Sequence, residues 1–143
     1  MPTIGSHWIL EMYDCPPEVI DDLERVRQAI RGAAKAARST MLHESAHRFE
    51  PQGVTALGLL AESHISVHTW PELGYAAADV FTCGEHALPE QACEHLAKVL
   101  QAGRRQVQHF ERGTAAPPER PLREPQPLVA ATEANADGSR DVG

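Results

Sequence analysis

The chain has 143 residues, of which 42% are hydrophobic and 23% charged, a composition that fits one compact domain with an aliphatic core. Its formal net charge of −7 disfavours binding to nucleic acid or to an anionic membrane surface, because both need basic patches. No apolar stretch approaches the roughly 20 residues that span a bilayer. We therefore expect neither a nucleic-acid partner nor a membrane partner.

The cysteine content indicates the redox environment. Cys15, Cys83 and Cys93 cannot all pair within one chain. The N-terminal sequence also lacks the positively charged start and apolar run of a secretion signal. We therefore expect reduced thiols and a cytoplasmic location.

The first half of the chain predicts a strand, a helix and a hairpin. The apolar run from His7 to Tyr13 predicts a strand, which ends at the turn residues 14–17. Apolar residues then recur at three- and four-residue steps from Val19 to Ala37, which predicts one amphipathic helix. Two strands over 40–49 and 54–62 follow, joined by the tetrapeptide EPQG.

The second half of the chain predicts a hairpin, a helix and a strand. Strands are predicted over 64–70 and 75–83, with the turn sequence PELG between them. Pro89 opens a second helix that Gly103 is well placed to end, and 105–111 form a last strand. Hairpin-length links favour antiparallel pairing, with the helices on one face. The predicted fold class is α+β, a two-layer sandwich.

The C-terminal segment differs in composition from the rest. Residues 114–143 are rich in proline and contain few apolar anchors. We expect this tail to be disordered, which leaves 1–113 as the folded domain.

Chemically versatile side chains concentrate in residues 59–84, LLAESHISVHTWPELGYAAADVFTCG. Taken alone, Ser63 is more often an ordinary strand or turn serine than a nucleophile, and no GxSxG elbow surrounds it. His64 and His68 are four residues apart, and on a strand that separation spans about 13 Å, too far for one ion. No CxxC pair occurs either, so we expect no metal site.

The combined motif is far more specific than its members. Residues 62–72 are ESHISVHTWPE, followed by GYAA at 74–77 and FTCG at 81–84, and preceded by HRFEPQGVT at 47–55. This set resembles the bacterial and archaeal pyruvoyl-dependent S-adenosylmethionine decarboxylases. The resemblance extends over about residues 5–112 in the order of the elements.

The resemblance implies that the chain cuts its own backbone. The Ser63 hydroxyl attacks the Glu62 carbonyl, and elimination of the resulting ester leaves a pyruvoyl cofactor. The products are a β chain, 1–62, and an α chain, 63–143. By similarity, His68 removes the Ser63 α-proton and the Thr55 hydroxyl assists. Many relatives have serine at the position of Thr55, and the additional methyl group favours slower processing.

The resemblance also assigns roles in turnover. The pyruvoyl ketone forms a Schiff base with the substrate amine and accepts electrons as carbon dioxide leaves. Cys83 reprotonates the α-carbon, Phe49 stacks on adenine, and Glu72 binds the ribose hydroxyls and faces the sulfonium. The alternative for each residue is a structural role: Cys83 as a buried thiol, Phe49 as a core aromatic and Glu72 as a turn carboxylate. Thr55 could likewise be a plain strand residue.

The predicted function is therefore decarboxylation of S-adenosylmethionine, which makes the aminopropyl donor for spermidine synthesis. One alternative is a pyruvoyl-dependent arginine or ornithine decarboxylase of the same fold, for which Trp8 and Glu11 leave room. Another is an unprocessed regulatory homologue, which would have lost Ser63, His68 or Cys83; none is lost. The family further implies a homodimer of αβ protomers whose active sites contain residues of both. Outside this set, the other two cysteines are expected to be packing thiols.

Overall fold

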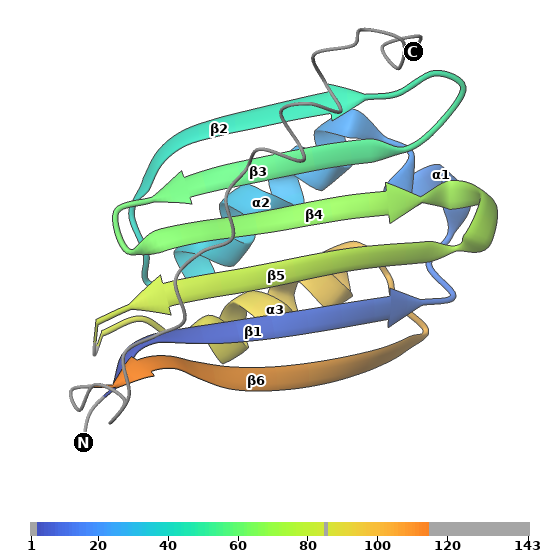
Figure 1. Cartoon of the computed structure of the whole chain (residues 1–143). Helices are drawn as coiled ribbons and strands as arrows, with labels where there is room; N and C mark the ends of the chain where they lie inside the picture. Colours follow the sequence, from blue (N-terminus) through green and yellow to red (C-terminus); the bar gives the residue numbers. More distant parts are fainter. Residues whose placement is uncertain (1–2, 85, 115–143) are drawn as a thin grey trace, which may run out of the picture.

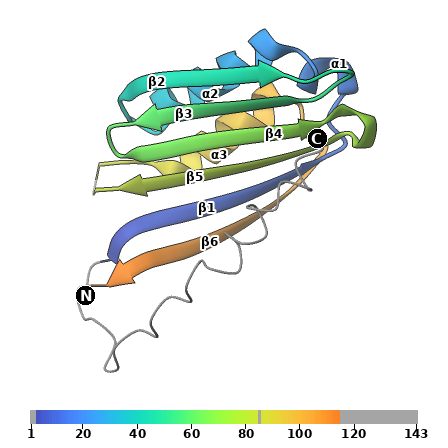
Figure 2. The same cartoon turned by 45° about the horizontal axis from the view of Figure 1, so that its top comes forward.

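The computed structural model describes residues 3–84 and 86–114, which form a six-stranded sheet with helices on one face (Figure 1). The strand order is β2-β3-β4-β5-β1-β6, visible side by side in Figure 2, and every neighbouring pair is antiparallel. The predicted two-layer α+β sandwich is confirmed. In chain order the elements are β1 (Thr3–Tyr13), α1 (Pro17–Ile20), α2 (Leu23–Ala36), β2 (Met41–Arg48), β3 (Val54–Leu60), β4 (Ser63–Trp70), η1 (Pro71–Leu73), β5 (Tyr75–Cys83), α3 (Pro89–Val99) and β6 (Arg104–Thr114).

The single predicted N-terminal helix is in fact two helices, α1 and α2. Asp22 lies between them and accepts hydrogen bonds from the backbone N–H groups of Glu24 and Arg25, at 3.0 and 3.2 Å. An aspartate in this position caps a new helix, because it satisfies donors that would otherwise lack partners. The apolar spacing runs through the junction, so it did not reveal the break.

The core lies between the sheet and the helices. On β5 the residues Ala76, Ala78 and Val80 are buried under α2 and α3, while the residues between them face the other side of the sheet. The two helices pack closely because Gly32 has no side chain. A Cβ there would lie 2.0 Å from Nε2 of His95 on α3, so a larger residue at this crossing would force the imidazole ring to move.

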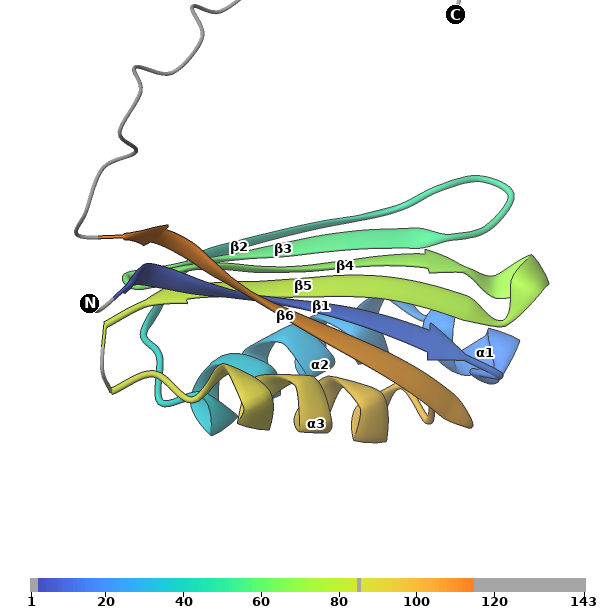
Figure 3. The same ribbon diagram turned by 60° about the horizontal axis from the view of Figure 1, so that its bottom comes forward.

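The opposite face of the sheet has no helix over it among the described residues, and Figure 3 shows both long helices on the other side. This open face includes exposed apolar side chains on β3 and β6. Leu57 is 47% exposed, Leu59 54% and Phe110 48%. Such a face differs from the polar outer surface that an isolated antiparallel sheet usually presents to water.

The last predicted boundary needs a correction. Thr114 belongs to β6, which pairs with β1 from Arg104 to Thr114, so the strand is longer than predicted and includes the first residue of the expected tail. Residues 115–143 lie outside the described residues. Within the described part, no helix is long and apolar enough to cross a membrane.

Candidate active site

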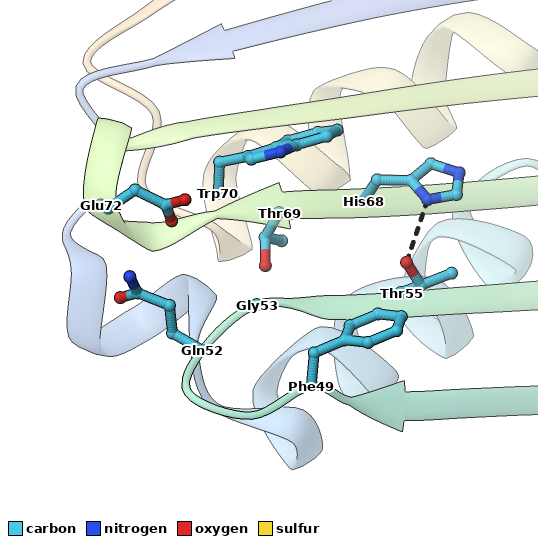
Figure 4. A pocket seen from close by; sticks show the side chains of 8 residues that line it. All are labelled: Phe49, Gln52, Gly53, Thr55, His68, Thr69, Trp70 and Glu72. Atoms are coloured by element: carbon cyan, nitrogen blue, oxygen red, sulfur yellow. Dashed lines mark hydrogen bonds between the residues drawn. The ribbon is translucent and has the colours of Figure 1, made fainter. Parts of the chain in front are cut away.

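A hollow of about 350 Å³ opens at the end of the sheet where β3 begins and β4 ends (Figure 4). Figure 4 shows Phe49 and Trp70 on either side of it, with Glu72 toward its outer end. Aromatic faces with a nearby carboxylate suit a flat, positively charged ligand. The lining residues are Phe49, Gln52, Gly53, Thr55, His68, Thr69, Trp70 and Glu72.

The inner wall of the hollow is formed by a paired hydroxyl and imidazole. Thr55 and His68 are direct cross-strand partners on β3 and β4, and Oγ1 of Thr55 lies 3.1 Å from Nδ1 of His68. The hydrogen bond fixes the orientation of the ring. It places a potential proton acceptor and a hydroxyl side by side, as acid–base chemistry requires.

The peptide between Glu62 and Ser63 lies at the other end of β4. Ser63 has φ +150°, a conformation that L-residues rarely adopt and that stores roughly 1–3 kcal/mol of strain. The Glu62 carbonyl accepts a hydrogen bond of 2.9 Å from the backbone N–H of Cys83. The Glu62 side chain accepts another, of 3.1 Å, from the N–H of Thr40. This peptide is therefore strained, and its carbonyl is already polarised by a donor.

The predicted site residues thus form two separate groups within one chain. Ser63 and His68 are the first and sixth residues of β4, so about 17 Å of extended strand separates them. A side chain cannot bridge that distance, and His68 does not reach Ser63 of its own chain. Between the groups, on the open face, lies a second hollow of about 420 Å³ lined by Leu57, Gly58, Leu59, His64, Ser66 and His68.

Known proteins have sequences similar to this chain over most of its length. A family model described as S-adenosylmethionine decarboxylase matches residues 6–113. The S-adenosylmethionine decarboxylase proenzyme of Parasynechococcus marenigrum (strain WH8102) is 56% identical over 122 residues, which are 85% of this chain and 95% of that protein. The proenzyme of Methanococcus maripaludis (strain DSM 14266) is 45% identical over 113 residues, 79% of this chain and 93% of that protein.

A solved structure agrees with the sequence matches. The crystal structure of the adenosylmethionine decarboxylase from Aquifex aeolicus VF5 superimposes with a TM-score of 0.76 at 36% identity, covering 85% of this chain and all of that one (100%). The chain belongs to the S-adenosylmethionine decarboxylase family.

The three cysteines of this family member differ in accessibility. Burial raises the pKa of Cys15 to about 11, and burial likewise raises the pKa of Cys93 to about 12. Both thiols therefore stay protonated and inert near neutral pH, as expected for packing residues. Cys83 is only partly buried and lies on the open face next to Glu62. It is the cysteine that a ligand at the Ser63 end of the sheet could touch.

The hollow in this S-adenosylmethionine decarboxylase homologue also depends on a residue outside the motif. Asp21, at the junction of α1 and α2, accepts hydrogen bonds from the N–H of Gly53 and from the guanidinium of Arg48, each at 2.8 Å. These two contacts hold the pKa of the Asp21 carboxyl below its usual 3.8. Asp21 thereby ties the turn that lines the hollow to the helical layer. No local sequence pattern predicts this contact, because the two segments are distant in the chain.

Sequence reasoning also missed four lining residues, Gln52, Gly53, Thr69 and Trp70. Trp70 could have been found from strand alternation, since it shares a face with His64, Ser66 and His68 on β4. Gln52 lies in the turn before β3, where no periodic pattern applies.

Proposed function

We propose that this chain is a proenzyme that cuts itself between Glu62 and Ser63 and then decarboxylates S-adenosylmethionine. The observation that supports this most directly is the backbone at Ser63. A positive φ at a serine costs free energy, and in known structures such strain persists mainly where function uses it. Here it occurs at the one serine that the family motif assigns to cleavage.

The cut requires only groups of the chain and water. The Ser63 hydroxyl adds to the Glu62 carbonyl, and the negative charge on its oxygen is stabilised by the Cys83 N–H. The C–N bond breaks and an ester forms. The ester then loses the Ser63 α-proton, and the main-chain carboxylate of Glu62 leaves. The dehydroalanine that remains takes up water and releases ammonia. The products are chains 1–62 and 63–143, the second beginning with a pyruvoyl group.

The residues around Ser63 fit a pyruvoyl group. The backbone N–H of Cys83 binds the Glu62 carbonyl, so a partly buried thiol belongs to the residue beside the peptide that is cut. When formed, the group supplies a carbonyl electron sink for the loss of carbon dioxide. Cys83 then acts as the acid that returns a proton to the substrate carbon.

The hollow at the other end of the sheet suits the nucleoside part of the substrate. Phe49 is 47% exposed, which leaves ring surface available for stacking and is inconsistent with the alternative of a core aromatic. Glu72 is exposed at the outer end of the hollow and offers a carboxylate to ribose hydroxyls or to a sulfonium. A cavity of about 350 Å³ with aromatic walls favours adenosine over the aliphatic side chain of arginine or ornithine.

The separation of Ser63 from His68 points to two copies of the chain. A second copy, placed face to face by a two-fold axis near the middle of β4, would bring its Thr55 and His68 over Ser63 of the first. The same pairing would cover Leu57, Leu59 and Phe110, which are otherwise exposed to water. We therefore infer a homodimer with two composite sites, in agreement with the expected assembly of αβ protomers.

Intact mass spectrometry of the purified protein, followed by a carbon dioxide release assay, tests the proposal. We expect two fragments split after Glu62, a carbonyl sensitive to borohydride, and turnover of S-adenosylmethionine. Ser63→Ala should leave the 15.6 kDa chain whole. A wild-type chain that stays whole after long incubation would refute the self-cleavage. Release of carbon dioxide from arginine or ornithine, but not from S-adenosylmethionine, would refute the proposed substrate.

A further inference from the structure

A cluster of polar side chains on the open face has no role in the chemistry described above. Its centre is Asp79 on β5, which accepts hydrogen bonds from Nε2 of His7 at 2.7 Å and Nε2 of His64 at 3.0 Å. The other carboxylate oxygen accepts a hydrogen bond from the hydroxyl of Ser66. Three strands, β1, β4 and β5, thus meet at one half-buried carboxylate.

The protonation states follow from the donors available. Arg112 on β6 lies 3.0 Å from Nδ1 of His7, and because a guanidinium only donates, that nitrogen must accept. The proton of neutral His7 is therefore on Nε2, toward Asp79. Burial alone would raise the pKa of Asp79, but the hydrogen bonds from Ser66, His64 and His7 outweigh it and hold the pKa below 3.8. Asp79 is thus an anion at neutral pH.

The same donors argue against a metal ion, although the ligand atoms of His7, His64 and Asp79 lie within 4.8 Å of one another. A metal would need the lone pair on Nε2 of His7, and that nitrogen holds the proton as long as Arg112 occupies Nδ1. The positive charge of Arg112 would also repel a cation. The cluster is better described as a carboxylate that holds two imidazoles.

One of these imidazoles belongs to the residue that directly follows Ser63. Asp79 therefore holds the strand immediately after the strained residue, through His64. The Cys83 N–H holds the carbonyl immediately before it. Both contacts come from β5, so a single strand forms hydrogen bonds to the residues on both sides of the peptide. Strain of this kind persists only where the surrounding structure opposes its release.

We propose that Asp79 is a positioning residue for self-cleavage, because its hydrogen bond to His64 keeps the Glu62–Ser63 peptide in its strained conformation. The inference rests on the proposed cleavage of this peptide. Asp79 itself touches neither Ser63 nor the carbonyl under attack. It acts through the His64 ring, and the Ser66 and His7 hydrogen bonds fix the direction of its oxygens.

Two substitutions at this site separate positioning from packing. Asp79→Asn keeps the shape but loses the charge, whereas Asp79→Glu keeps the carboxylate and adds a methylene. If the charged hydrogen bond holds His64, Asn should slow the appearance of the two fragments about 10-fold or more, and Glu should recover part of the rate. If Asp79 only fills space, the order reverses, with Asn close to wild type and Glu slower.

A double-mutant cycle tests the path through His64. His64→Phe keeps an aromatic ring and removes the donor, so it should slow the cut about as much as Asp79→Asn. The two changes together should be no slower than either one, since both break the same contact. Additive slowing would contradict the proposal. Glu44→Gln is the matched control, because Glu44 on β2 is a carboxylate in an ion pair with Arg31 of α2, and its loss should leave the rate unchanged.

Light scattering of the same samples excludes an effect on assembly. Slow cleavage in an assembly of wild-type mass supports a positioning role. Slow cleavage together with separation into single chains would contradict it, because Asp79 would then act on the pairing of copies. Failure of the wild type to cut would instead refute the self-cleavage, which distinguishes the two proposals.

Discussion

Thr55 is held by its own chain in a way that bears on the rate of cleavage. Its hydroxyl is bonded to His68, and its β-branched side chain has few accessible rotamers. To reach the Glu62 carbonyl of a second copy, the hydroxyl would have to leave that bond or share it. A serine could rotate more easily, which agrees with the expectation that threonine slows the cut.

Substitutions at Thr55 test this argument. Thr55→Ser should speed the cut a few-fold, because the hydroxyl is kept and its rotation is freed. Thr55→Ala should slow it about 10-fold, the equivalent of one lost hydrogen bond. Gel analysis of freshly purified chains over time measures both rates. Equal rates for all three chains would mean that Thr55 is only a strand residue.

Cys83 has one role through its backbone and a second through its thiol, and one substitution divides them. Cys83→Ala keeps the N–H that polarises the Glu62 carbonyl, so the cut should proceed. The variant lacks the thiol acid, and turnover should fall by about 100-fold or more, as is typical when a general acid is removed. Mass spectrometry and carbon dioxide release on the same sample measure the two effects. If the Cys83→Ala chain stays uncut, the thiol takes part in cleavage as well.

At the scale of the elements, the α1–α2 junction links the helical layer to the hollow. Thr69 on β4 donates to the carbonyl of Ile20 at 2.8 Å and accepts from the N–H of Val54 at 2.9 Å. Together with the contacts of Asp21, this network fixes the turn between β2 and β3 against α1. The pocket end of the sheet is therefore held by helix termini, which a strand pattern does not reveal.

The depressed pKa of Asp21 makes part of this stability depend on pH. A carboxyl whose pKa is lower in the folded state contributes stability above its unfolded pKa of 3.8 and loses it as the pH falls through the folded value. Asp21→Asn should therefore reduce the free energy of unfolding by about 1 kcal/mol near pH 7, and the difference should shrink below pH 4. Urea titrations in a Ser63→Ala background measure it. Glu18→Gln, an exposed carboxyl on α1, is the control.

Much of the fold was readable from the sequence, because strand alternation and turn residues are local signals. Both central hairpins and α3 appear where proline, glycine and apolar spacing predicted them. The break at Asp22 was not predicted, since a capping aspartate looks like any polar residue on a helix. The insertion of β1 between β5 and β6 depends on contacts between distant segments, and no local pattern encodes it.

The candidate site was predictable only in part for the same reason. The motif named Ser63, His68 and Cys83 as members of one family pattern, and the resemblance implied sites that contain residues of both protomers, but neither indicated which of these residues lie together within one chain. The sheet places Ser63 and His68 at opposite ends of β4, with Cys83 on β5 beside the Ser63 end, and the proposed face-to-face dimer would unite them. Asp79 lies inside the motif segment, yet its contact with His7 requires the β1–β5 pairing, which the sequence did not show.

Active sites shared between two copies of the chain can be tested by mixing two inactive chains. Neither Ser63→Ala nor His68→Ala should be cut when it is expressed alone, because the first lacks the nucleophile and the second lacks the base. In a mixed dimer, one of the two sites combines Ser63 from the His68→Ala chain with His68 from the Ser63→Ala chain. That site is complete, so the His68→Ala chain should be cut on co-expression.

About half of the dimers would be mixed if the chains pair at random. Distinct affinity tags on the two chains identify which one is cleaved in the mass spectrum. Co-expression of Ser63→Ala with Cys83→Ala serves as a positive control, since the Cys83→Ala chain should be cut with or without its partner. If the His68→Ala chain stays whole in dimers shown by tandem purification to be mixed, the base and the nucleophile do not come from different copies.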